Sequence, residues 1–105
     1  MEKSNIINNR AYTVGDEKLF SDLPTEKQQA LINWIEQNIQ RRNSANFKHS
    51  SYGLKQLAEK AIDFYISNNQ FKDAMLFCGF HPVNPTELNW YYRISEESLV
   101  FKEVI

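Results

Sequence analysis

The cationic side chains of this chain gather in one segment, residues 41–60. That segment carries five cations and a single acid, Glu59, which gives a local charge of +4, whereas the whole chain has a net charge of −1. The five cations are Arg41, Arg42, Lys48, Lys55 and Lys60. A charge asymmetry of this kind can mark a surface that faces a partner. A solvated face beside a loop would carry the same charges, so both interpretations stay open.

A second polar group stands at the start of a predicted helix that follows Ser67. Asparagine side chains can pair with adenine through two hydrogen bonds, and Lys72 can reach a phosphate or a guanine. In helix-turn-helix proteins, residues at the start of the second helix contact base edges in this way. Asn68 and Asn69 are the candidates here. Asp73 lies on the same helix and would repel phosphate, so the region also fits a protein partner.

The sequence offers little catalytic chemistry. Cys78 and His81 form an i, i+3 pair, and nucleophilic thiol chemistry needs a thiolate with a neighbouring base. However, Cys78 shares a helical stripe with Phe71 and Met75, which predicts a buried and inert thiol. The adjacent acids Glu96 and Glu97 point to different sides of an element, so they do not converge on one substrate atom.

Cofactor and metal motifs are missing as well. The glycines are far apart in the sequence, so neither a P-loop nor a G-x-G-x-x-G turn can form. The soft metal ligands His49, Cys78 and His81 lack the C-x-x-C or H-x-x-x-H spacing of zinc sites. We therefore predict no enzyme activity, no metal, no cofactor and no small-molecule substrate.

Length and composition favour one domain. The chain has 105 residues, of which 42% are hydrophobic, 24% charged and 13% aromatic, as is typical of a globular protein. We predict a weakly ordered segment over residues 1–20 and a single α+β domain over residues 21–105. No apolar run is long enough to span a membrane. The single cysteine indicates a reducing, cytoplasmic setting.

The first helix that must position the cations is predicted from its apolar spacing. It begins near Pro24, because proline suits a first helical turn. Arg41 and Arg42 end it, opposite the negative end of the helix dipole. A polar connector follows over Asn43–Ser50, and we expect it to place the Phe47 ring in the core.

Two further helices follow the connector. Ser50 or Ser51 caps the second, and the third runs from a capping box of Ser67 with Gln70 to a C-terminal Gly79. The helical stripes predict a shared core. Its expected residues are Trp34, Ile35, Leu54, Leu57, Ile62, Phe71, Met75 and Cys78.

Several short segments read as strands because they are β-branched or aromatic and flanked by turns. They are Ala11–Val14 before a turn at Gly15-Asp16, Phe64–Ile66, Phe80–Val83 and Trp90–Ile94. A short terminal helix is predicted over Ser95–Val104. Alternation puts Trp90 and Tyr92 on one face of the last strand and Tyr91 on the other. One face must be core, so at most one or two of these rings are free to stack a base.

The predicted fold is therefore α+β, with three helices and a small antiparallel sheet or β-hairpin. This arrangement resembles a winged helix. In that family the extra short strand lies between the first two helices, whereas Phe64–Ile66 would lie between the second and third.

A second resemblance is carried by the sequence itself. The stretches S-S-Y-G-L-K-Q-L-A-E-K, F-Y-I-S-N-N-Q-F-K-D-A-M-L-F-C-G-F and L-N-W look like a family of small, functionally unassigned proteins of phages and other mobile elements. The family has no catalytic motif to carry over. The resemblance implies a setting and no mechanism.

We accordingly predict a small non-enzymatic binding protein of a mobile element. A protein partner, either host machinery or a second copy of the chain, is favoured by the near-neutral charge and the aromatic content. Duplex DNA is the alternative, and no membrane is involved. The predicted partner-binding residues are Arg41, Arg42, Lys48, Lys55, Asn68, Asn69 and Lys72.

Overall fold

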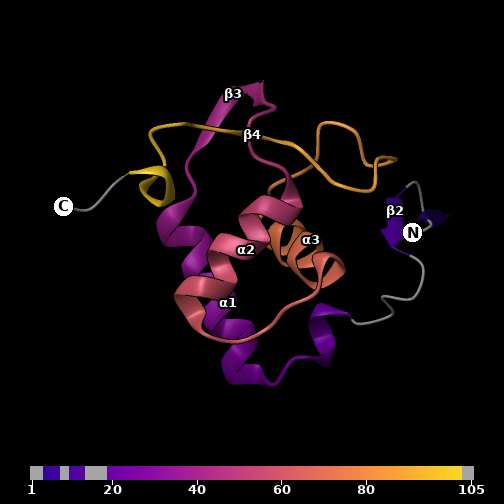
Figure 1. Ribbon diagram of the computed structural model, residues 1–105, viewed down its shortest axis with the longest axis vertical. Helices are drawn as coiled ribbons and strands as arrows, with labels where there is room; N and C mark the ends of the chain where they lie inside the picture. The colour runs from indigo at the N-terminus through magenta and orange to yellow at the C-terminus, as the bar shows by residue number, and fades with distance from the viewer. Residues whose placement is uncertain (1–3, 8–9, 14–18, 103–105) are drawn as a thin grey trace.

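The computed structural model of the protein describes residues 4–7, 10–13 and 19–102. Within these residues the chain forms three α-helices, two short 3₁₀ helices and four strands (Figure 1). The elements are β1 (Ser4–Ile7), β2 (Arg10–Thr13), η1 (Phe20–Asp22), α1 (Thr25–Asn38), β3 (Arg41–Asn46), α2 (Ser51–Ile62), α3 (Asn68–Phe77), β4 (Tyr92–Ile94) and η2 (Leu99–Phe101). The predicted α+β class is confirmed.

Local signals in the sequence set the starts of the helices as predicted. α1 begins directly after Pro24. Ser50 caps α2, because its side chain accepts a hydrogen bond from the Gly53 amide at 3.2 Å. Ser67 and Gln70 form the expected capping box of α3. The Gln70 amide donates to Ser67 Oγ at 3.1 Å, and the Ser67 amide donates to Gln70 Oε1 at 2.9 Å.

The end of the first helix differs from the prediction. α1 stops at Asn38, and Arg41 and Arg42 lie on β3 instead of facing the dipole of α1. The chain after α1 is held by a distant segment, because the Gln40 amide donates to Ser98 Oγ at 2.8 Å. This long-range bond favours an extended chain where the sequence indicated a continuing helix.

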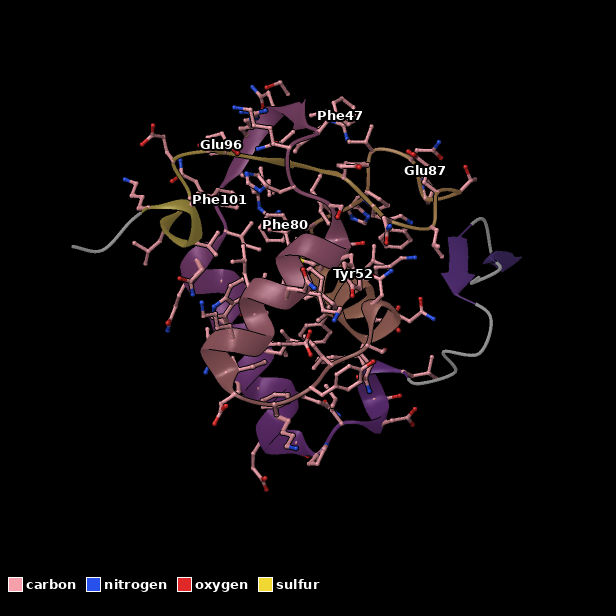
Figure 2. All side chains as sticks on the ribbon, in the orientation of Figure 1. Phe47, Tyr52, Phe80, Glu87, Glu96 and Phe101 are labelled. Atoms are coloured by element: carbon pink, nitrogen blue, oxygen red, sulfur yellow. The ribbon has the colours of Figure 1, made fainter. Side chains whose placement is uncertain are left out.

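The predicted connector over Asn43–Ser50 is also wrong in its first half, which belongs to β3. Phe47 was expected in the core, but its side chain is 64% exposed. Figure 2 shows Phe47 at the end of β3, pointing away from the helices. The ring packs against Tyr91 instead, with 5.5 Å between the ring centroids.

The last strand is shorter than predicted. β4 begins at Tyr92, because the backbone groups of Trp90 form hydrogen bonds with Ser51 and not with a neighbouring strand. The Trp90 amide donates to Ser51 Oγ at 3.0 Å, and its carbonyl accepts from the Ser51 amide at 2.7 Å. Trp90 is thus tied to the start of α2 and not to a strand. Among the described residues of the helix predicted over Ser95–Val104, only η2 is helical.

Two other predicted strands, Phe64–Ile66 and Phe80–Val83, lie within the described residues and do not form. Phe64–Ile66 forms a loop after Asp63, which ends α2 in the left-handed conformation with φ 61°. In Phe80–Val83, an isolated bridge joins Pro82 to Tyr92. Proline has no N–H to extend a ladder of hydrogen bonds, so the strand does not develop.

The partner of β4 is β3 and not a hairpin strand after α3. The two strands run antiparallel, with Arg41 opposite Ile94 and Asn46 opposite Tyr92, and the register shifts between these pairs. β3 stands between α1 and α2, where a winged helix has its extra strand, and not between α2 and α3 as predicted. The likeness to a winged helix itself stays a prediction.

A second antiparallel pair lies near the N-terminus. β1 pairs with β2, with Ser4 opposite Thr13. The strand predicted over Ala11–Val14 overlaps β2, whereas Val14 and the turn predicted at Gly15-Asp16 lie outside the described residues. β2 contacts α3, and Figure 1 shows it to the side of that helix.

The three helices contact one another and enclose a core with the inner face of the β3–β4 sheet. The predicted core residues that are buried are Trp34, Ile35, Leu54, Phe71 and Met75. Ile62 and Cys78 pack against this core but are only partly buried. Trp90 and Tyr92 are fully buried and Tyr91 is partly exposed, as alternation along a strand predicted.

The prediction that Leu57 is a core residue was wrong, because its side chain is 39% exposed. α2 turns a different face inward, formed by Ser51, Leu54, Lys55 and Ala58. The buried face is therefore rotated from the purely apolar stripe, and it includes a lysine.

Candidate partner-binding site

The seven predicted partner-binding residues do not form one surface. Arg41 and Arg42 lie side by side on β3, and Lys48 follows that strand with an exposed side chain. The other four belong to α2 and α3.

Lys55 is buried, with 5% of its surface exposed. Its ammonium group pairs with Glu59 one turn along α2. Nζ also lies 4.8 Å from the ring centroid of Tyr52 and 5.5 Å from that of Tyr65. The lysine stem packs in the core while its charge is neutralised at the edge, and a partner contact by Lys55 stays a prediction.

The start of α3 is covered by the loop over residues 84–90. Asn69 and Lys72 are 1% and 2% exposed. Lys72 Nζ donates to the Leu88 carbonyl at 3.0 Å and lies 4.3 Å from the Trp90 ring centroid. Asn68 is half-buried, and its Nδ2 donates to an oxygen of this loop at 3.2 Å. Asn68 and Lys72 thus hold the loop, and a partner-binding role for these two residues and for the buried Asn69 stays a prediction.

Two of the remaining cations, Arg41 and Arg42, line a pocket of 260 Å³ at the β3–β4 sheet. Its lining consists of Arg41, Arg42, Gly79, Phe80, His81 and Arg93, and none of these residues is acidic. β3 supplies two arginines, β4 supplies the third, and the turn after α3 supplies the rest. The sheet therefore brings together charges that are about fifty positions apart in the sequence.

Arg41 is held firmly at the rim of this pocket. Its Nη2 donates to the Cys78 carbonyl at 2.7 Å and its Nη1 to the Gly79 carbonyl at 3.2 Å. Its guanidinium carbon lies 3.9 Å from the ring centroid of Phe80. Figure 2 shows Phe80 below the β3–β4 sheet in this view. The cation thus satisfies carbonyls at the end of α3, where a positive charge is favourable.

Arg42 is fixed by its own strand. Its Nε donates to the Ser44 carbonyl at 3.0 Å and its Nη2 to the Ala45 carbonyl at 2.9 Å. Arg93 is exposed on β4, between the buried Tyr92 and Ile94. It therefore lies on the outer face of the sheet.

An aromatic pair adjoins these cations. Tyr91 and Arg93 alternate with buried residues along the chain, so both lie on the outer side of the sheet. Phe47 packs on Tyr91, and its ring is exposed. We call the surface formed by the three pocket-lining arginines and this aromatic pair the sheet face. It consists of Arg41, Arg42, Phe47, Tyr91 and Arg93.

Three residues of this region, His81, Tyr91 and Arg93, were not among the predicted partner-binding residues. The alternation that buries Trp90 and Tyr92 was a signal that Arg93 points outward. No local pattern indicated that β3 would bring Arg41 and Arg42 beside it.

Beside the sheet face, a polar cluster ties β3 to the chain after β4. Asn46 Nδ2 donates to Glu96 Oε2 at 2.6 Å and to the Ile94 carbonyl at 3.1 Å. His49 Nε2 lies 2.8 Å from the same Glu96 oxygen. The hydrogen bond from Asn46, followed by the charge of His49, lowers the pKa of Glu96. These contacts hold the end of β3 and the residues after it against the end of β4 and Glu96.

Cys78 provides a test of the chemistry of the pocket rim. Burial, followed by the Glu36 carboxylate, raises the pKa of the Cys78 thiol from 9.0 to about 11. The thiolate fraction at pH 8 is then about 100-fold lower than in an ordinary cysteine. We expect iodoacetamide to alkylate the native protein at pH 8 about 100-fold more slowly than the urea-unfolded protein.

The raised pKa also sets the sign of a pH dependence. Folding favours the protonated thiol, so the stabilising contribution is fully present below pH 9.0 and is lost as the pH rises through about 11. Equal alkylation rates in the native and the unfolded protein would contradict the assignment of Cys78 as an unreactive thiol.

No protein-family model, curated protein sequence or solved structure matches this chain. The interpretation of the sheet face therefore depends on its own geometry.

Two general findings apply to residues 4–7, 10–13 and 19–102. Among them, no group of three or more His, Cys, Asp or Glu side chains could hold a metal ion. None of the helices formed by these residues has both the length and the apolar surface to cross a membrane.

Proposed function

We propose that this chain is a non-catalytic binding protein whose partner is a protein with acidic groups. The observation that carries the proposal is the sheet face, where three arginines line one pocket and the exposed Phe47 packs on the partly exposed Tyr91, two residues before Arg93. Arginine and aromatic side chains are enriched in protein interfaces and supply many of their hot spots. An acidic partner surface would complement the charge of the arginines.

The partner's setting is part of the same proposal. The resemblance to small proteins of phages and other mobile elements suggests host machinery, element machinery or a second copy of this chain. A second copy is a weaker candidate, because the sheet face carries only positive charge and would repel itself.

Duplex DNA is the competing partner. The position of β3 between α1 and α2 favours it, since a winged helix has its extra strand there. The burial of Asn69 and Lys72 counts against it, because buried side chains do not reach base edges and Lys72 contacts the 84–90 loop. A DNA interface would then depend on the sheet face and not on a recognition helix.

A charge reversal tests the proposal. We expect Arg93→Glu to abolish the capture of specific proteins by cross-linking and affinity purification from the cells that express this chain. The reason is that reversal of an exposed interface charge replaces attraction by repulsion. The matched control is Lys60→Glu, which changes the charge equally at an exposed site on α2. A set of captured proteins that is the same for both variants would contradict the proposal.

Gel shifts with duplex DNA at about 50 and 200 mM salt separate the two partner classes, because phosphate contacts weaken steeply over this range. Micromolar binding at low salt that falls tenfold or more, and that is lost in Arg93→Glu but not in Lys60→Glu, would favour DNA. No shift at either salt concentration is the result expected for a protein partner.

A further inference from the structure

The pocket in the sheet face has the character of a receptor for one small anion. We infer that it binds a single phosphate monoester group, presented by the protein partner proposed above. This inference rests on the proposed function and makes the chemistry of the partner more specific. The pocket has a volume of 260 Å³, just below the roughly 300–1,000 Å³ of typical small-molecule sites. This size suits one compact group.

The guanidinium donors are fixed before any ligand arrives. Each guanidinium has five N–H donors in a rigid fork. Arg41 uses only part of its fork on the Cys78 and Gly79 carbonyls, and Arg42 uses Nε and Nη2 on carbonyls of its own strand. Both groups therefore keep donors for an oxyanion while their orientation is already set, which lowers the entropic cost of binding.

Gly79 is what allows the backbone to approach Arg41 so closely. Its φ is +85°, a conformation that favours glycine, and a β-carbon there would lie 3.2 Å from Nη2 of Arg41. Without a side chain at this position, the turn after α3 leaves the guanidinium accessible at the pocket rim.

The charge of the pocket is unbalanced. Arg41, Arg42 and Arg93 line the same volume, and none of the described lining residues carries a negative charge. Neighbouring cations repel one another, and a bound anion replaces this repulsion by attraction. The structure thus favours a ligand that brings more than one negative charge to a single point.

A phosphate monoester meets this requirement better than a nucleic-acid backbone does. It carries a charge of about −1.5 to −2 at pH 7 and three strong acceptor oxygens, which suit several guanidinium groups at once. A duplex spreads single charges along a line. Three guanidiniums around one pocket are arranged for a point charge, not for a line of charges.

The test is a titration of the ¹⁵N-labelled full chain with inorganic phosphate, followed by two-dimensional NMR at constant ionic strength. We expect saturable shifts of the amides of Gly79, His81 and Arg93. Arg93→Gln should weaken phosphate binding about tenfold or more, because a charged hydrogen bond contributes about 1.5–3 kcal/mol. Lys60→Gln is the control and should bind like the unmodified chain.

Titrations with four further ligands identify which kind of molecule presents the phosphate group. A phosphoserine peptide and a phosphotyrosine peptide represent a modified partner, glycerol phosphate represents a free ester, and a duplex with hydroxyl ends carries only diesters. The inference requires at least one phosphopeptide to bind more tightly than glycerol phosphate and the duplex. Tighter binding of the duplex, tighter binding of glycerol phosphate, or shifts that chloride reproduces would each overturn it.

The two proposals fail in different ways. If phosphate does not bind but protein capture still depends on Arg93, the binding function stands and the phosphate inference is wrong. If phosphate binds and no captured protein depends on Arg93, the pocket is an anion site without the proposed partner, and the inference about a phosphorylated protein is wrong.

Discussion

Replacing Trp90 with alanine is expected to lower the free energy of unfolding by about 3–5 kcal/mol. The side chain is fully buried, and its Nε1 donates to the Pro85 carbonyl at 3.1 Å. Its ring also lies under the Lys72 ammonium. The substitution would leave a large cavity and remove the anchor of the 84–90 loop over α3. Since domains are stabilised by about 5–15 kcal/mol, it would remove much of the total.

Urea unfolding followed by circular dichroism measures this loss. The matched control is Phe47→Ala, because that aromatic ring is 64% exposed and should change the stability by about 0.5 kcal/mol or less. If Trp90→Ala lost no more than Phe47→Ala, the loop would not depend on the tryptophan.

A pair of leucines on one helix gives the second large effect. Leu54→Ala should destabilise the protein by about 2–5 kcal/mol, because the side chain is fully buried in the core. Leu57→Ala removes the same atoms three residues later, from a side chain that is 39% exposed. We expect its cost to be clearly smaller, below about 1 kcal/mol.

The same urea experiment compares both variants under identical conditions. The two substitutions are chemically equal, so any difference reports their position on α2. Equal losses would mean that α2 is rotated from its orientation in the structure. A greater loss of stability for Leu57→Ala would mean that α2 buries the apolar face predicted from the sequence.

The orientation of α2 shows where hydrophobic spacing stops being informative. The apolar pattern counted Leu57 inward and left out Ser51 and Lys55, which are buried. Both have polar partners that make their burial affordable. Ser51 Oγ accepts from the Trp90 amide, 39 positions away in the sequence. A pattern confined to one helix cannot contain that information.

Features that depend on neighbouring residues were predicted well. The Ser50 cap and the capping box of Ser67 with Gln70 each span four residues, and both are present. β3 is the opposite example. Its sequence, R-R-N-S-A-N, has no β-branched or aromatic residue, and its strand conformation comes from pairing with β4.

The residues of the candidate site show the same contrast between local signals and long-range contacts. Arg41 and Arg42 were found from the local charge alone. The burial of Lys72 could not be predicted, because the loop that covers it returns from residues 84–90, and only the folded chain brings the Leu88 carbonyl to its ammonium group. Arg93 was missed because its neighbours in space lie on β3.

The pairing of β3 with β4 also governs when the sheet face comes into existence. A ribosome adds about 5–20 residues per second, so about 3–10 s separate the synthesis of Arg42 from that of Arg93. During this interval the nascent chain can fold its helices, whose contacts are more local, but its strand partner has not been made. The arginine pocket is thus assembled only after β4 has been synthesised, and a partner that requires all three arginines meets a binding-competent surface only after nearly every contact of the described core can form.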